Sequence, residues 1–111
     1  MDIIERIKSQ LAENPVILYM KGSPAFPQCG FSGRAAQILE HCGTEYAYVN
    51  IFEEPELREN LKAYSQWPTY PQLYIKGELV GGSDIMMELF QKGELQEMLA
   101  SAAAGGAASS S

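Results

Sequence analysis

Residues 16–20 (VILYM) form an apolar run between two segments whose apolar residues recur at helical spacing. Such a run is typical of a central strand buried on both faces. Upstream, Ile3, Ile7 and Leu11 recur as on one face of a helix, and Asn14-Pro15 ends that pattern. A doubly buried strand needs helices to cover it, so this part of the chain predicts an α/β layer arrangement.

The rest of the chain continues the alternation of helical and strand patterns. The predicted elements are a helix from near Cys29 to the cap at Gly43, a strand over 46–51, a helix from Pro55, strands over 72–75 and 78–81, a helix over 83–90 and a shorter helical piece from Glu94. Lys76-Gly77 between the two later strands predicts a hairpin turn and an antiparallel pair. Long helical crossovers predict parallel pairing for the other strands. The expected fold is α/β, with a small four-stranded mixed sheet flanked by helices.

Composition limits the domain count and the classes of partner. The 111 residues fit one domain, predicted over 1–99. Over 100–111 we expect a frayed helix end that runs into an Ala/Gly/Ser-rich flexible tail, which is either a linker or a dispensable terminus. A net charge of −6 argues against nucleic acid or an anionic membrane as partner. No apolar run approaches the roughly 20 residues of a membrane span, and no secretory signal opens the chain. Two cysteines are too few for a disulfide scaffold, which favours a cytoplasmic, reducing compartment.

The two cysteines have different settings. Cys29 follows a loop rich in Gly and Pro and lies at the expected start of a helix, where unpaired N–H groups and the helix dipole favour a thiolate. A thiolate attacks disulfides and binds soft metals, whereas the alternative is a buried structural cysteine. Cys42 continues the apolar stripe of the same helix and is interpreted as a core residue. Thirteen helical residues span about 20 Å, beyond the roughly 7 Å between the Cα atoms of a disulfide, so we expect a single active thiol.

Two further segments carry candidate binding groups. Residues 67–72 (WPTYPQ) enter a strand through Pro71, and a cis Tyr70–Pro71 bond would leave the Tyr70 backbone free to pair with an extended peptide. Residues 81–84 (GGSD) place small residues and an acid at a helix start. The backbone N–H groups there can hold a carboxylate and Asp84 an ammonium, although a plain helix cap is an equal interpretation.

These segments occur in one order: Lys21, Cys29-Gly30-Phe31-Ser32, residues 67–72 and residues 81–85 (GGSDI). In this order and spacing the chain resembles the monothiol glutaredoxins of the CGFS type, in particular single-domain bacterial members, over about residues 1–99. The resemblance implies a thioredoxin-like fold, glutathione binding and, in a dimer, a [2Fe-2S] cluster.

The resemblance also implies roles for individual residues. Cys29 would be the catalytic redox thiol and the cluster ligand, shared with the dimer partner. The residues implied in glutathione binding are Lys21, Phe31, Arg58, Tyr70, Pro71, Gly82, Ser83 and Asp84. Many members have Cys where this chain has Ser83, so a regulatory disulfide to that position is unavailable, while we expect the hydroxyl to cap the helix. Without the resemblance, Arg58 is typical of a solvated helix face and Lys21 of a strand end.

Two functions remain open from the sequence. The first is a carrier whose homodimer holds a [2Fe-2S] cluster with two Cys29 thiolates and two glutathione thiolates, and passes it to acceptor apo iron-sulfur proteins. The second is a glutathione-dependent oxidoreductase that resolves protein–glutathione disulfides through Cys29. The resemblance implies weak exchange activity for members with a long loop before the cysteine, as residues 23–28 form here, so we favour the carrier. It also suggests a BolA-type partner.

Overall fold

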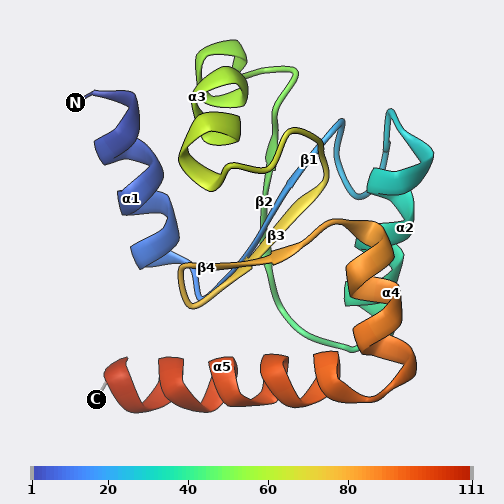
Figure 1. Cartoon of the computed structure of the whole chain (residues 1–111). Coiled ribbons are helices and arrows are strands. Elements are labelled where there is room, and N and C mark those ends of the chain that lie inside the picture. Colours follow the sequence, from blue (N-terminus) through green and yellow to red (C-terminus); the bar gives the residue numbers. More distant parts are fainter. Residues whose placement is uncertain (1, 111) are drawn as a thin grey trace.

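The computed structural model describes residues 2–110, with side-chain burial as far as residue 103. A four-stranded mixed sheet in the order β2-β1-β3-β4 lies between two groups of helices (Figure 1). The elements in chain order are α1 (Ile3–Glu13), β1 (Val16–Met20), α2 (Gly30–His41), β2 (Ala47–Asn50), α3 (Pro55–Ser65), β3 (Gln72–Ile75), β4 (Glu78–Gly81), α4 (Ser83–Gln91) and α5 (Glu94–Ser110). The predicted fold class is therefore confirmed.

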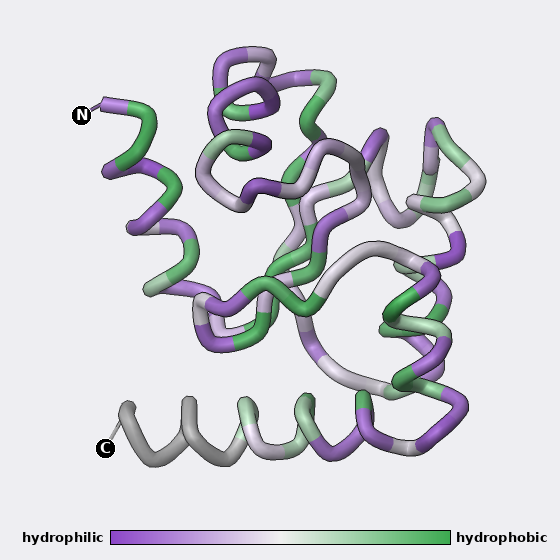
Figure 2. Tube along the Cα trace, viewed as in Figure 1, coloured by the Kyte–Doolittle hydropathy of each residue, from purple (hydrophilic) through white to green (hydrophobic). Residues whose placement is uncertain are grey.

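The central strand β1 is buried along its whole length, as the apolar run predicted. Its side chains alternate between the two faces of the sheet. Leu18 and Met20 belong to the core cluster with α2, α4 and α5, whereas Ile17 and Tyr19 belong to the cluster with α1 and α3. Figure 2 shows this apolar interior along the strands and the alternation of hydrophilic and hydrophobic residues around α1. The two-sided core fixes the register of the sheet.

The strand directions differ from the prediction at β3. β1 and β2 pair in parallel, from Ile17 opposite Ala47 to Met20 opposite Asn50, as the helical crossover predicted. β3 is not adjacent to β2 and runs antiparallel to β1, with Gln72 opposite Tyr19. The cause is the position of α3, which lies near the carboxyl ends of β1 and β2 (Figure 1), so the chain re-enters the sheet from that end. The predicted antiparallel hairpin through Lys76-Gly77 is confirmed.

The carboxyl-terminal helix is longer than predicted. α5 runs from Glu94 through Ser110, where the sequence predicted a shorter helix with a frayed end and a flexible tail over 100–111. Ala102 is fully buried in the core cluster of α2 and α4, so the helix contributes to the core beyond residue 99. Alanine has the highest helix propensity, which explains how a segment without large apolar groups continues a helix. Among the helices of residues 2–110, none is long and apolar enough to cross a membrane.

Candidate functional site

A groove of about 350 Å³ lies beside Cys29, where four separate segments of the chain meet. Lys21 comes directly after β1, Cys29 directly before α2, the loop over 67–71 directly before β3, and residues 82–85 at the start of α4. Each of the four segments lies next to the end of a strand or helix: β1, α2, β3 or α4. These elements contribute residues to the buried core, so the packing of the core fixes where the groove lies.

Cys29 is the N-cap residue of α2 and a partly buried free thiol. The pKa of this thiol lies below its ordinary value, chiefly because the nearby Ser32 backbone N–H favours the negatively charged thiolate. Desolvation, the second-largest cause, raises the pKa, whereas the Phe31 N–H, the positive charge of Lys21 and the Ser32 hydroxyl each lower it by less. The arrangement at this helix start thus favours the thiolate, which is the nucleophilic and metal-binding form.

Ser32 links the thiol to the end of β1. Its side chain is fully buried, and its Oγ accepts a hydrogen bond from the Lys21 backbone N–H at 3.0 Å. A hydroxyl that accepts one bond can still donate its own hydrogen, and the Ser32 hydroxyl is among the groups that lower the pKa of Cys29. The sequence analysis gave this residue no separate role, because a serine one turn into a helix is also typical of solvent-facing positions.

The loop between Lys21 and Cys29 is folded tightly on itself. The Gln28 N–H donates to the Lys21 carbonyl at 2.9 Å, and the Gly22 N–H donates to Asn50 Oδ1 at 3.0 Å. Gly22 has a φ of +93°, and a Cβ at this position would lie 2.5 Å from the Phe26 carbonyl oxygen, so only glycine fits. The loop leaves Phe26 76% exposed. Backbone N–H groups of Gly22 and Gln28, bonded to Asn50 Oδ1 and the Lys21 carbonyl, thus hold the loop that leads to Cys29.

Cys42 is separated from the site by the length of α2. It is the C-cap residue, a free thiol packed partly against the core cluster of α2, and burial raises its pKa. The interpretation of Cys42 as a core residue agrees with this placement. Cys29 is the single cysteine that lines the groove.

The structure brings most of the predicted site residues together. Those that line the groove are Lys21, Cys29, Phe31, Tyr70, Pro71, Gly82, Ser83 and Asp84. The Tyr70–Pro71 peptide bond is cis. Gly82 suits the wall of the groove, because a Cβ there would lie 3.3 Å from the Pro71 carbonyl oxygen. The Asp84 carboxylate is exposed and lies 4.0 Å from Arg34.

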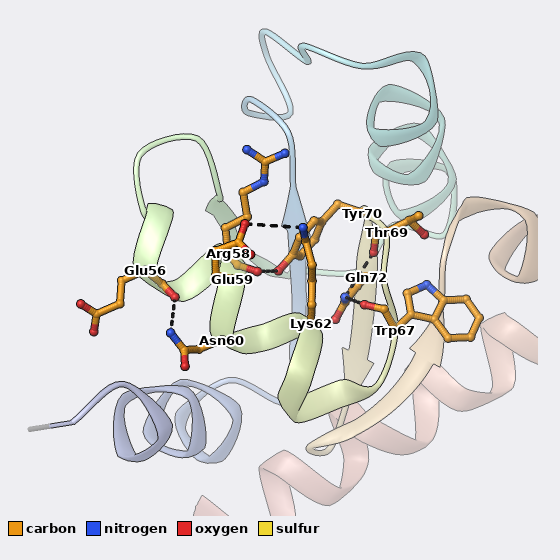
Figure 3. Close-up of polar contacts among 9 residues, drawn as sticks. All are labelled: Glu56, Arg58, Glu59, Asn60, Lys62, Trp67, Thr69, Tyr70 and Gln72. Atoms are coloured by element: carbon orange, nitrogen blue, oxygen red, sulfur yellow. Dashed lines mark hydrogen bonds and ion pairs between the residues drawn. The ribbon is translucent and has the colours of Figure 1, made fainter.

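Arg58 lies apart from the other predicted site residues, and one expectation, the helix cap at Ser83, differs from the structure. Arg58 does not line the groove: its guanidinium lies 5.6 Å from the centre of the Phe52 ring, and Figure 3 shows the side chain pointing away from Trp67. Ser83 does not cap α4 with its hydroxyl, because Gly82 is the N-cap and no side chain caps this helix. Ser83 is instead the buried first residue of α4. Both placements arise because sequence position fixes the place of a Cα atom but not the direction of a side chain.

Trp67 is a groove residue to which the sequence assigned no definite place. It lines the groove together with Thr69, and its buried indole N–H has no hydrogen-bond partner among residues 2–110. A buried donor without a partner carries a free-energy cost that a bound acceptor removes. This orphaned donor marks the wall of the groove as one suited to a ligand with hydrogen-bond acceptors.

The glutaredoxin family profile matches residues 16–80, which include β1, Cys29, the loop before β3 and the hairpin. The chain belongs to the glutaredoxin family. It is 55% identical over 104 residues to glutaredoxin 4 of Pasteurella multocida (strain Pm70), covering 94% of this chain and 95% of that protein. It shares the thioredoxin-like glutaredoxin fold with the solution structure of reduced poplar apo GrxS14, with a TM-score of 0.80 and 45% identity over 92% of this chain and 94% of that one.

A second solved glutaredoxin is more distant in sequence but equally close in fold. The holo form of glutaredoxin C1 from Populus tremula x tremuloides has a TM-score of 0.82 and 28% identity, covering 92% of this chain and 90% of that one. In the present chain, Cys29 is followed by Gly30-Phe31-Ser32, so a single thiol lies at the start of α2. The chain is therefore a monothiol member of the glutaredoxin family.

Proposed function

We propose that this monothiol glutaredoxin binds glutathione and carries a [2Fe-2S] cluster, bridged between two subunits, for iron-sulfur cluster assembly and transfer. The observation that carries the proposal is the single groove-lining thiol, Cys29, with its lowered pKa. An accessible thiolate of this kind binds iron, and the groove beside it offers room for a second, small thiol.

The chemistry of the groove fits glutathione, a small peptide with two carboxylates and one ammonium group. Lys21 offers a cation for a carboxylate, and no ion pair of residues 2–110 uses it. Asp84 offers an exposed carboxylate for the ammonium group. The Tyr70 backbone and the Trp67 indole, which also line the groove, offer donors to the peptide carbonyls. Arg58 lies farther from this groove, so we give Lys21 the larger part in binding a carboxylate.

The ligand count leads from glutathione to a dimer. A [2Fe-2S] cluster is held by four thiolates, and no group of three His, Cys, Asp or Glu side chains suited to a metal exists within residues 2–110. One chain contributes Cys29 alone, two chains contribute two thiolates, and two glutathione molecules complete the set. We therefore propose a monomeric apo protein and a homodimer that depends on the cluster.

Reconstitution under anaerobic conditions with ferrous iron, sulfide and glutathione tests this proposal. Visible absorbance and iron content should show a cluster, and native mass spectrometry should show two chains, one cluster and two glutathione molecules. A loaded monomer, or a dimer that forms its cluster without glutathione or another added thiol, would refute the mechanism.

Two cysteine variants sharpen the same experiment. Cys29→Ser should remain colourless, because the only groove thiol is lost. Cys42→Ser is the matched control and should keep the cluster, because Cys42 packs against the core at the far end of α2. A folded Cys42→Ser protein that binds no cluster would contradict the assignment of the ligand.

The second candidate function is glutathione-dependent thiol-disulfide exchange, which the lowered pKa of Cys29 favours. The Cys29 thiolate would attack the glutathione sulfur of a mixed disulfide, which releases the target thiolate and leaves Cys29 joined to glutathione. A second glutathione thiolate would then attack that disulfide, which forms oxidised glutathione and restores Cys29. Release of glutathione from a glutathionylated test peptide measures this activity, and a rate equal to that of the Cys29→Ser variant would exclude it.

The partners and compartment belong to the same proposal. Acceptor apo iron-sulfur proteins and a BolA-type protein are the partners that we propose, and a reducing cytoplasm is the compartment in which free glutathione is abundant. Transfer of the cluster to an apo ferredoxin, followed by its absorbance, tests the first. The BolA-type partner is tested by native mass spectrometry, in which a dimer of this protein with the BolA-type protein should replace the homodimer.

A further inference from the structure

Gln72, the first residue of β3, has a fully buried polar side chain next to the groove. Its amide nitrogen donates to the backbone carbonyls of Trp67, at 3.0 Å, and Thr69, at 3.2 Å. Its Oε1 accepts from the Tyr74 hydroxyl at 3.0 Å. Figure 3 shows the amide between the two carbonyls. Both N–H donors of this amide are thus used on one loop, the loop that leads to Tyr70.

The bond to Thr69 fixes the peptide plane between Thr69 and Tyr70. This peptide is trans, and in a trans peptide the C=O and N–H bonds point in opposite directions. Because the Thr69 carbonyl points toward the buried amide of Gln72, the Tyr70 N–H points away from it. No backbone hydrogen bond of residues 2–110 uses the Tyr70 N–H. Tyr70 therefore holds an unused donor in a fixed orientation in a residue that lines the groove.

The rest of Tyr70 is anchored separately. Its side chain is buried, and its hydroxyl donates to the Arg58 carbonyl of α3 at 2.7 Å. The phenol thus fixes the position of Tyr70. The Gln72 amide fixes the rotation of the peptide between Thr69 and Tyr70. Loss of the Gln72 amide would leave the Cα of Tyr70 in place and release the peptide plane.

We propose that Gln72 is a positioning residue for ligand binding, which turns the Tyr70 N–H toward the groove so that it donates to a backbone carbonyl of a peptide-like ligand. This inference rests on the proposed glutathione site. It gives Gln72 no contact with the ligand, so its effect passes entirely through the Thr69–Tyr70 peptide.

Two variants separate positioning from plain structural support. Gln72→Met keeps the length of the side chain and removes the bonds to both carbonyls. Tyr74→Phe is the matched control, because it removes the bond on the other side of the same amide and leaves the two donors on the loop. Both variants leave a buried polar group unpaired and lower the free energy of unfolding, whereas only the first releases the peptide plane.

Titration calorimetry measures the affinity for reduced glutathione, which would not change if Gln72 only stabilised the fold. Gln72→Met should bind reduced glutathione about tenfold more weakly than wild type, and Tyr74→Phe should bind within about twofold. The pH dependence of Cys29 alkylation should be unchanged in both, since neither variant alters α2. Equal affinity of folded Gln72→Met and wild type, or equal weakening in both variants, would overturn the inference.

Amide hydrogen exchange of the wild-type protein tests the same inference without any substitution. The Tyr70 amide should exchange at least about tenfold more slowly with saturating reduced glutathione than without it, because a bound carbonyl protects it. Binding without protection of this amide would overturn the inference even if Gln72→Met failed to fold. If wild type binds no glutathione by calorimetry, the proposed function fails first.

Discussion

Replacing Ser32 with Ala removes one hydroxyl that serves both the thiol and the end of β1. The hydroxyl accepts from the Lys21 backbone N–H at 3.0 Å, and it is the smallest of the groups that lower the pKa of Cys29. Ser32→Ala should therefore raise the pKa of Cys29 toward its ordinary value and lower the free energy of unfolding. The pKa should remain below the ordinary value, because the Ser32 backbone N–H is the largest cause of the shift and survives the substitution.

The size of the stability loss follows from the partner left behind. A fully buried N–H without an acceptor costs about 1–3 kcal/mol, and the Lys21 N–H is only part-buried, so we expect about 1–2 kcal/mol. For a chain of this length that corresponds to a fall in Tm of about 3–10 °C. Ser23→Ala is the matched control, since its hydroxyl accepts from the Phe26 N–H at 3.1 Å in an exposed position. Water replaces that bond, so the control should lose at most about 0.5 kcal/mol.

Thermal unfolding measures the first effect, and the pH dependence of iodoacetamide alkylation measures the second. The reasoning is refuted if Ser32→Ala unfolds at the same temperature as Ser23→Ala. It is also refuted if the stability falls while the pKa of Cys29 stays at the wild-type value, because the hydroxyl would then serve the backbone alone.

Three further predictions follow from charge and burial. Lys21→Glu should weaken glutathione binding, measured by calorimetry, more than Arg58→Glu does, because Lys21 lines the groove and Arg58 lies against Phe52; equal effects would contradict the placement. Ala102→Asp should lower the free energy of urea unfolding by about 1–3 kcal/mol, because it buries an unpaired carboxylate, and the neighbouring exposed Ala103→Asp should not; equal stability would show that α5 does not pack at this turn. The folded pKa of Cys29 is lowered, so its contribution to stability is fully present above the unfolded value of about 8.5 and is lost as the pH falls through the folded value. The stability difference between wild type and Cys29→Ser should therefore shrink on acidification, and a difference independent of pH would contradict the lowered pKa.

The helices and strands could be predicted from the sequence because each is encoded by one continuous segment. The apolar run of β1, the stop at Asn14-Pro15 and the turn at Lys76-Gly77 each report local conformation directly. The direction of β3 is different, because it depends on where α3 lies relative to the sheet, and the sequence holds no local record of that. The length of α5 was not predicted, although the evidence is local. Its small residues give no amphipathic pattern, and only the helix propensity of alanine favours the longer helix.

The candidate site also has a part that could be predicted from the sequence and a part that could not. The positions of Cys29, of the loop before β3 and of the start of α4 follow from motifs that are continuous in sequence, and the structure brings those motifs to one groove. The contacts that tune them join residues far apart, such as the Ser32 hydroxyl with the Lys21 N–H. Arg58 shows the limit most clearly, since its guanidinium lies against the Phe52 ring and the residue is not among those that line the groove. Side-chain direction depends on packing, which no motif records.

The identity of residue 32 connects both proposed functions. Three residues after Cys29, one helical turn away, the chain has a buried serine, and the other cysteine lies at the far end of α2. Exchange through Cys29 therefore needs a resolving thiol from solution, and a cluster at Cys29 needs thiolates from outside the chain. The groove lined by Lys21 and Asp84 is where a small charged thiol can supply the resolving thiol or the additional cluster ligand. Under both proposals the activity of this glutaredoxin should thus rise and fall with the concentration of free glutathione, and loss of the groove should abolish both activities together.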